Sequence, residues 1–439
     1  MAERIGMAER IGTSITASGM ANPSPTLVPK ARYTSPEFAA LEAERLWPRV
    51  WQIACSVDHV AEPGDFFTLR SGRHSVIVVR SEDGELRAFQ NACRHRGNEI
   101  CQGSGAGLRE LRCPYHRWSW DLRGRLRGMP SRPGFGAFRN EEFPLLPASV
   151  GSWGRLVFVN LDPGAMPLSE WLEGIPDDAA AMRPDEFRCV ATLAMPLEAN
   201  WKVIADGFSE TYHVQGLHRE MLGSMDDIDA PQRLWSRHGV SYQDYGVPSP
   251  RLGNDVSAQT VWDSWITTQG GRMGPEYVEP CPVPPLPAGG TVRELIAEKI
   301  RAHHAKTFGC DLSGFDAKRM LRLAQYSLFP NATVLVWGEM VNVLIARPGP
   351  APDRGEFAAF LLYRMPPGAP RQRPFDAPAS AEADLGFVIN QDVSVAKSVQ
   401  RGLAQPGLTH IALSNEECRI IHMHRNLERF LGIGPEDPA

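Results

Sequence analysis

The chain has 439 residues, of which 43% are hydrophobic and 22% are charged, and its formal net charge is −5. This composition is typical of a globular protein with two or three hydrophobic cores, not of a disordered chain. The acidic balance and the lack of a long Lys/Arg run argue against nucleic acid as a partner.

Membrane insertion and secretion find no support in the sequence. The longest apolar stretches, Ala191–Leu197 and Thr333–Trp337, are far shorter than the roughly 20 residues that cross a bilayer. MAERIG occurs at residues 1–6 and again at 7–12, and we interpret this repeat as an alternative start or a cloning scar, because no secretory signal pattern accompanies it. Eight cysteines are widely scattered, which favours a reduced, cytoplasmic setting over a disulfide scaffold.

The first 160 residues predict an arm and then a small β domain. Residues 1–44 form a polar N-terminal arm and the start of a short helix, which we predict around Pro36–Trp47. From Gln52 to Asp162, β-prone runs alternate with turn signals, which predicts antiparallel strands. These runs are Phe66–Leu69, Ser75–Arg80, Leu86–Gln90, Leu111–Cys113, Trp118–Asp121 and Leu156–Asn160.

The remainder of the chain is mixed in character. Helical patterns cover Ser169–Met182, Asn200–Gln215, Thr291–Thr307 and Asp384–Arg401, and β-prone runs cover Arg188–Met195, Ala332–Trp337, Met340–Ala346 and Glu356–Arg364. Because helices and strands are interleaved without a regular βαβ alternation, we predict an α+β fold.

Two cysteines and two histidines in the β domain have the spacing of metal ligands. Cys93-x-His95 precedes Cys113-x-x-His116 by seventeen residues. Such a set can hold either a structural zinc ion or a [2Fe–2S] cluster with Cys on one iron and His on the other. The pairing of one Cys with one His in each half favours the cluster, since common zinc sites place two Cys on one loop and two His on a helix. Several glycines near these residues keep the backbone turned, so that amides can point toward sulfur.

A second candidate site lies in the predicted helix after Asn200. Glu210 and His213 are three residues apart and project from one side of a helix, whereas His218 points elsewhere unless the helix breaks. We expect a break or bulge at Gly216 to turn His218 back toward the same metal. Two His with one carboxylate form the facial site of iron(II) oxygenases, which leaves positions open for dioxygen and substrate. A carboxylate is therefore required.

These motifs resemble those of a known family. The blocks Cys-Arg-His-Arg-Gly and Cys-Pro-Tyr-His-Arg-Trp, together with Asn-Trp-Lys…Glu-x-x-His-x-x-x-x-His, resemble the large (alpha) subunits of Rieske non-haem iron oxygenases of the ring-hydroxylating type. The resemblance runs from about Pro36 to Gly432. It implies a Rieske [2Fe–2S] β domain over residues 45–165 and a helix-grip α+β catalytic domain over residues 166–439.

The resemblance also implies the role of each site residue. Cys93, His95, Cys113 and His116 would bind the cluster, and His213, His218 and Asp392 would bind the mononuclear Fe(II). Asp392, in the late block Asn390-Gln-Asp, is assigned by resemblance alone, since its position otherwise fits an ordinary helix N-terminal acid. In the family, Asp usually stands three residues before the first His and connects the iron site to the Rieske His of a neighbouring subunit. Here that residue is Glu210.

The implied activity is O2-dependent hydroxylation of an aromatic or hydrophobic small molecule, with ring dihydroxylation as the first reading. The alternative is a monooxygenase or demethylase acting on an N-methyl, O-methyl or quaternary ammonium substrate. Electrons would come from an NAD(P)H-dependent reductase, directly or through a ferredoxin, and pass between adjacent subunits by way of His116 and Glu210. That route implies a homotrimer, with or without a small β subunit.

Two other classes of protein share part of the pattern. An electron-transfer Rieske protein needs only the first site, and a zinc-stabilised binding module with a lipid-type cavity would hold zinc and be colourless. The second ligand set, within the residues that follow the β domain, favours the oxygenase over both.

Overall fold

The computed structural model describes residues 13–15, 25–377 and 385–437. The repeated MAERIG segment and residues 16–24 of the predicted N-terminal arm lie outside these residues. The chain forms two compact units. One contains residues 40–172 and 370–375, and the other contains the described residues among 13–39, 173–369 and 376–437.

The smaller unit is built from antiparallel strands, as its alternating sequence predicts. Its seven-stranded sheet has the order β3 (Gln52–Ser56), β12 (Leu156–Asn160), β11 (Pro147–Trp153), β6 (Leu86–Gln90), β5 (His74–Arg80), β4 (Phe66–Ser71) and β7 (Ser104–Gly105). A three-stranded sheet has the order β10 (Leu126–Gly128), β9 (Ser119–Trp120) and β8 (Leu111–Arg112). Helix α3 (Leu168–Trp171) lies at the C-terminal end of the segment 40–172. The strands hold the loops that carry the candidate cluster ligands.

The larger unit is organised by a nine-stranded sheet. Its order is β1 (Thr13–Ile15), β14 (Gln232–Leu234), β15 (Gly239–Asp244), β16 (Arg322–Leu328), β17 (Ala332–Val336), β18 (Met340–Ala351), β19 (Arg354–Arg364), β13 (Phe187–Leu197) and β20 (Phe375–Ala377). A separate ribbon pairs β2 (Thr26–Pro29) with β21 (His410–Leu413). The predicted fold class, a β Rieske domain followed by an α+β domain, is confirmed.

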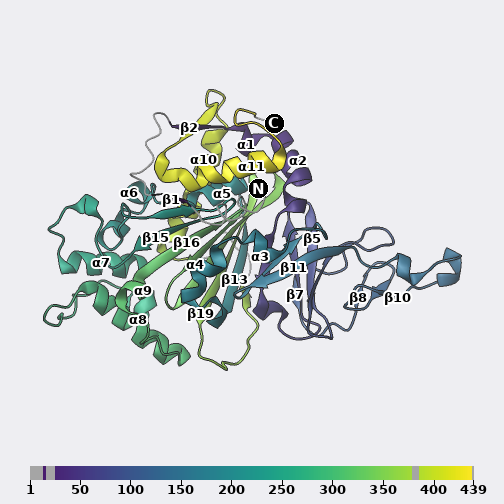
Figure 1. The fold of residues 1–439 in the computed structure, drawn as a ribbon, viewed down its shortest axis with the longest axis horizontal. Helices are drawn as coiled ribbons and strands as arrows, with labels where there is room; N and C mark the ends of the chain where they lie inside the picture. Colours follow the sequence, from purple (N-terminus) through teal and green to yellow (C-terminus); the bar gives the residue numbers. More distant parts are fainter. Residues whose placement is uncertain (1–12, 16–24, 378–384, 438–439) are drawn as a thin grey trace, which may run out of the picture. The chain divides into compact units, whose positions relative to one another are not determined.

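Helices pack on this sheet, and one of them brings residues from near the C-terminus close to α5. Helix α5 (Trp201–Gly207) packs on β18 and β19, and α10 (Phe387–Leu403) packs on α5. Figure 1 shows α10 and α11 (Cys418–Leu431) above the sheet, near α5. The other helices of the unit are α1 (Ala31–Thr34), α4 (Ile175–Ala179), α6 (Val214–Leu217), α7 (Ala258–Gln269), α8 (Val292–Phe308) and α9 (Ala317–Leu321).

Helix α2 (Pro36–Arg45) begins where the sequence predicts a helix and is followed by a 3-10 turn over Trp47–Arg49. Helices α1, α7, α9 and α11 were not predicted. Buried tryptophans on α7, Trp262 and Trp265, belong to a core shared with α8 and α9, so tertiary packing stabilises α7 more than its local sequence does.

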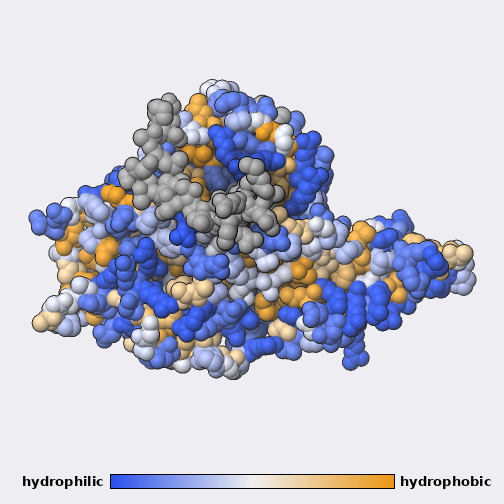
Figure 2. Space-filling model, viewed as in Figure 1, coloured by the Kyte–Doolittle hydropathy of each residue, from blue (hydrophilic) through white to orange (hydrophobic). Residues whose placement is uncertain are grey.

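Among the described residues, no helix combines the length and apolar character that crossing a bilayer requires. The face shown in Figure 2 is mostly hydrophilic, and its hydrophobic residues form separate patches.

Asn200 connects three parts of the larger unit. Its side-chain oxygen caps α5 by accepting from the Lys202 amide at 3.0 Å. Its Nδ2 donates to the backbone oxygens of Tyr33 at 3.0 Å and Pro352 at 2.7 Å. Asn200 is 3% exposed. The Tyr33 carbonyl also accepts a longer bond from Gln400 Nε2 at 3.4 Å, so the Pro352 carbonyl depends more on Asn200.

We predict that Asn200→Ala lowers the free energy of unfolding by about 2–4 kcal/mol, because it removes a helix cap and the hydrogen bonds to the Tyr33 and Pro352 carbonyls. The measurement is urea unfolding followed by tryptophan fluorescence. Ser257→Ala is the matched control, since Ser257 caps α7 at an exposed position and should cost only about 0.5–1 kcal/mol. Equal losses in the two variants would contradict this role of Asn200.

Candidate metal centres

A turn between two short helices carries the first candidate iron ligand. Helix α5 ends at Gly207, and α6 begins only at Val214, with His213 as its N-cap residue. The continuous helix predicted over Asn200–Gln215 is therefore wrong. Glycine is a poor helix former, and the Glu210 carboxylate accepts a hydrogen bond from the His213 backbone amide at 3.0 Å, a local bond that competes with helical hydrogen bonding.

The predicted break at Gly216 is also wrong. Gly216 lies inside α6, which ends one residue later at Leu217. His218 is the C-cap residue, with φ −109° and ψ 47°. The chain therefore changes direction on both sides of a single helical turn, and this places the two imidazoles on the same side.

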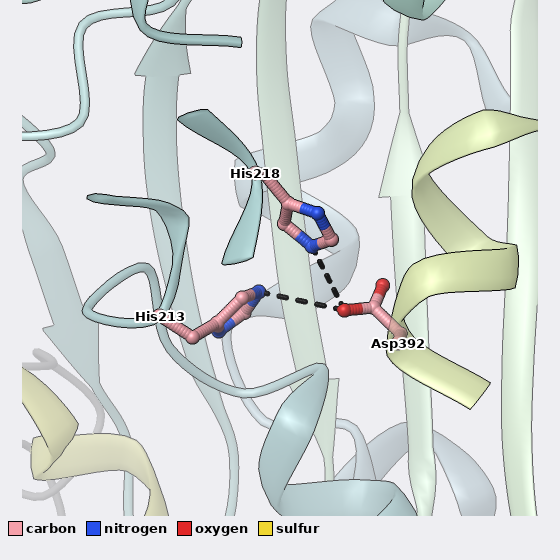
Figure 3. A group of neighbouring side chains, drawn as sticks. All are labelled: His213, His218 and Asp392. Atoms are coloured by element: carbon pink, nitrogen blue, oxygen red, sulfur yellow. Dashed lines mark hydrogen bonds and ion pairs between the residues drawn. The ribbon is translucent and has the colours of Figure 1, made fainter. Parts of the chain in front are cut away.

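Asp392 joins the two histidines from a distant part of the sequence. It lies in the second turn of α10, and its Oδ1 is 2.8 Å from His218 Nε2 and 3.6 Å from His213 Nε2. Figure 3 shows both rings directed at this carboxylate. One ligand atom from each residue lies within 4.8 Å of the others. Two imidazoles and one carboxylate at this separation fit a metal ion of the iron(II) class.

Each histidine has a second partner that orients its ring. His213 Nδ1 hydrogen-bonds Glu210 Oε1, and His218 Nδ1 lies 2.7 Å from Gln391 Oε1. An acceptor beside each Nδ1 favours a proton on that atom, and a metal ion in the site would then be bound by both Nε2 atoms and by Asp392. This arrangement matches the outer partners that fix metal-binding histidines.

The charges around the triad favour cations. Burial lowers the pKa of His213, but the hydrogen bond with Glu210 and the charges of Glu210 and Asp392 outweigh that effect and raise its pKa above the usual value. Asp206 lies at the end of α5. Burial raises its pKa to about 7, although the hydrogen bond from the Tyr33 hydroxyl lowers it. The negative groups beside His213 thus stabilise positive charge, either a proton or a metal ion.

Two cavities touch the triad, and they differ in what they reach. A cavity of about 340 Å³ contacts His213 and Asp392 and is walled largely by apolar residues of α10, β21 and α11. A cavity of about 90 Å³ contacts His213, His218 and Asp392 together. A substrate must approach the open positions of a metal held by all three ligands, so we assign the smaller cavity as the candidate reaction chamber. Its lining includes Met221, Tyr245 and Leu335.

The smaller unit brings the four candidate cluster ligands together at two loops. Cys93 and His95 lie between β6 and β7, and Cys113 and His116 lie between β8 and β9. The two cysteines are buried, and their thiols are within hydrogen-bonding distance. The imidazoles of His95 and His116 have centroids 4.7 Å apart.

The chemistry of this donor set fits a [2Fe–2S] cluster. His95 Nδ1 is buried and has no hydrogen-bond partner among the described residues, as expected of a ligand atom. Burial raises the pKa of Cys93, while the backbone amides of His95 and Arg96 hydrogen-bond to its sulfur and lower it. Such bonds to sulfur are one means of tuning a cluster potential. Trp118 stacks on His95 with centroids 5.2 Å apart, which shields one side of the site.

Comparison with known proteins agrees with this arrangement. The profile described as "Ring hydroxylating alpha subunit (catalytic domain)" matches residues 184–433, and that of the Rieske [2Fe–2S] domain matches residues 50–142. The chain belongs to the Rieske-type ring-hydroxylating alpha-subunit family. The resemblance seen in the motifs is confirmed, and with it the family's cofactors, a [2Fe–2S] cluster and a mononuclear iron.

Similar proteins act on different substrates. The glycine betaine monooxygenase oxygenase subunit of Chromohalobacter salexigens is 30% identical over 213 residues, 47% of this chain and 46% of that protein. The carnitine monooxygenase oxygenase subunit of Acinetobacter baumannii is 30% identical over 220 residues, covering 50% and 58%. These matches span about half the length of the curated relatives.

Solved structures share the fold. A quaternary ammonium Rieske monooxygenase in complex with L-carnitine has a TM-score of 0.64 and 18% identity, covering 95% of this chain and 99% of that one. Naphthalene 1,2-dioxygenase from Rhodococcus sp. has a TM-score of 0.62 and 21% identity, covering 92% and 94%. Because these scores are nearly equal, the fold alone does not separate the two reaction types.

The structure thus brings the residues of each predicted ligand set together. That these residues bind the iron and the cluster stays a prediction. Sequence reasoning missed Gln391. Its position next to Asp392 was visible in the Asn390-Gln-Asp block, but only the approach of α10 to His218 shows that its side chain reaches the imidazole.

We predict that Gln391→Leu lowers the affinity for the mononuclear iron about 10- to 100-fold, because His218 loses the acceptor that orients its ring. Iron content after dialysis against a graded chelator series measures the change, and the cluster absorbance should not alter. Gln405→Leu is the control, since Gln405 follows α10 at an exposed position. If both variants retained iron equally, the proposed role of Gln391 would be wrong.

Proposed function

We propose that this chain is the catalytic subunit of a Rieske-type monooxygenase that acts on a methylated ammonium compound. The observation that carries the oxygenase assignment is the convergence of His213, His218 and Asp392 within 4.8 Å. Iron(II) held by two His and one carboxylate has open positions at which dioxygen can be activated.

The residues of the chain prepare this site in three ways. Glu210 and Gln391 hold protons on the Nδ1 atoms, so that His213 and His218 offer Nε2 to the metal. Asp392 supplies the anionic ligand from a separate helix. Apolar residues from α10 and the sheet, including Val388 and Leu344, enclose the chamber and limit access of bulk water.

The volume of the chamber does not separate the two substrate classes. It is about 90 Å³, below the roughly 150 Å³ of a protein cavity that binds benzene, and a trimethylammonium compound is no smaller than benzene. Either substrate therefore requires the walls to move or extends into the larger cavity that also contacts His213 and Asp392. Our preference for the monooxygenase alternative over ring dihydroxylation, the first reading of the sequence, rests on the chamber lining and on the relatives.

The chamber lining and the curated relatives favour an ammonium compound. The aromatic rings of Phe208 and Tyr245 line the chamber, and such rings attract an ammonium ion. None of the described lining residues is a Lys or Arg that would repel it. The rings of Trp337 and Trp265 are a less suitable site for a substrate cation. The Arg272 guanidinium already lies over them, at 4.1 and 5.1 Å from their ring centroids. Relatives named for glycine betaine and carnitine fit this substrate class.

We further propose that an NAD(P)H-dependent reductase supplies electrons, directly or through a ferredoxin, and that the chain assembles with copies of itself. Family membership supports both proposals. The homotrimer, a small β subunit and a cytoplasmic location stay predictions.

We predict that anaerobically purified protein contains about three irons per chain and shows a Rieske-type electron paramagnetic resonance signal after reduction by dithionite. His213→Ala should lose the mononuclear iron and all oxygenation while keeping that signal. His303→Ala is the control histidine, because it lies on α8 outside both ligand sets. Oxygenation by His213→Ala would contradict the ligand assignment, and zinc in place of iron would contradict the oxygenase proposal.

Labelled dioxygen separates the two reaction types. We predict that a methylated ammonium substrate acquires one oxygen atom from ¹⁸O2, detected by mass spectrometry in the product or in an aldehyde trapped before exchange with water. Incorporation of both atoms into an aromatic diol would instead establish ring dihydroxylation.

A further inference from the structure

The reaction chamber contains an uncharged polar group whose orientation is set from behind by a buried arginine. Gln243 on β15 and Gln325 on β16 both line the chamber and are 1% and 7% exposed. Behind them lies Arg419 of α11, which is 3% exposed. Among the described residues, no carboxylate forms a salt bridge with Arg419.

Arg419 bonds to neutral oxygens instead. Its Nε donates to Gln232 Oε1 at 3.0 Å, and its Nη2 donates to Gln325 Oε1 at 3.1 Å. Burial lowers the pKa of Arg419 to about 10, so the guanidinium keeps its proton near neutral pH. Burying a cation without a carboxylate partner costs free energy. This cost indicates that Arg419 has a role, and the contacts it makes show that it orients the neighbouring amides.

The direction of each amide follows from this cation. A guanidinium only donates, so the Gln325 atom that faces it must be the oxygen. Gln325 Nε2 then donates to the Phe208 backbone oxygen at 2.7 Å. Gln243 must in turn donate to Gln325 Oε1, which it does through Nε2 at 2.7 Å, and the same Nε2 donates to Ser241 Oγ at 3.1 Å.

This chain of bonds leaves the Gln243 carbonyl oxygen without a partner among the described residues. The hydroxyl of Tyr245, two residues further on and also lining the chamber, likewise has no hydrogen-bond partner among the described residues. Gln243 and Tyr245 thus offer a fixed acceptor and a hydroxyl that can donate. A substrate hydroxyl, which donates and accepts, matches this pair.

A carboxylate does not match it. None of the described residues that line the chamber is Lys or Arg. Glu210 and Asp392 together offset the two positive charges that iron(II) brings, so no positive charge remains to hold an anionic substrate group. A carboxylate placed here would lose its hydration and face the Gln243 oxygen, another acceptor, with only the neutral Tyr245 hydroxyl as a donor.

We infer that Gln243 is a specificity-determining residue, positioned by Arg419 through Gln325, that accepts a hydrogen bond from a substrate hydroxyl. This inference rests on the proposed function for the ammonium part of the substrate. It assigns the chain to hydroxyl-bearing methylammonium compounds and separates it from enzymes that take betaines.

The test is isothermal titration calorimetry on the anaerobic, iron-loaded full chain, with three ammonium probes. Choline carries the hydroxyl, ethyltrimethylammonium lacks it, and glycine betaine carries a carboxylate. Choline should bind about threefold to tenfold more tightly than ethyltrimethylammonium, the range of one neutral hydrogen bond, and glycine betaine should bind more weakly than choline. Gln243→Met, which has a similar shape and no acceptor oxygen, should remove the preference for choline.

Leu344→Met is the matched control, because Leu344 lines the same chamber away from these amides. It should change the affinities for choline and ethyltrimethylammonium by similar factors. Gln243→Asn provides a second variant, since it keeps an amide but withdraws the oxygen, and it should also lose the preference. Equal binding of the two probes by the unmodified chain, an unchanged preference in Gln243→Met, or tighter binding of glycine betaine would overturn the inference.

A second pair of probes, benzyl alcohol and toluene, separates this inference from the proposed function. If the ammonium probes fail to bind but benzyl alcohol binds more tightly than toluene in a manner that depends on Gln243, the ammonium substrate class is wrong and the role of Gln243 stands. Failure of both hydroxyl probes to bind would overturn the role of Gln243.

Discussion

The contact between His218 and Asp392 is the constraint on which the catalytic unit depends. The two residues are 174 positions apart, yet His218 Nε2 and Asp392 Oδ1 lie 2.8 Å from each other. Bringing a carboxylate and two imidazoles to one point requires α10 to lie against α5 and the turn after α5 to project both histidines toward it. The sheet beneath α5 therefore acts as a rigid support for a site formed by residues from its surface layers.

The same support accounts for the Asn-Trp-Lys sequence that opens α5. Asn200 caps the helix and bonds two distant carbonyls, and Trp201 is buried in the unit. Lys202 is fully buried, with its ammonium group 4.7 Å from the Trp201 ring centroid and 5.1 Å from that of Phe38. None of these residues is a candidate ligand. Their role is to hold the helix whose end positions Glu210 and His213.

Polar groups within the catalytic unit are arranged in two sets with different tasks. Glu210 and Gln391 accept hydrogen bonds from the Nδ1 atoms of the ligand imidazoles and so favour Nε2 as the metal-binding atom. Gln243 and Gln325 belong to a separate set that is oriented by Arg419 and faces the substrate chamber. Because a buried polar group must be hydrogen-bonded to be tolerated, each set specifies the direction of its members. One set therefore prepares the metal, and the other presents a fixed acceptor to the substrate.

The sequence by itself determined the family, the fold class and both candidate ligand sets, because metal binding demands particular side chains at short, recognisable spacings. Cys93-x-His95 and Cys113-x-x-His116 carry that information locally. The sequence could not show that α5 stops at Gly207, since side-chain bonds from Glu210 compete with a helical pattern that is otherwise regular. Nor could it reveal Gln391 beside His218 or Arg419 behind Gln325, because each contact joins segments from distant parts of the chain. Only the tertiary structure decides such contacts, since they depend on how helices pack on the sheet and not on local periodicity.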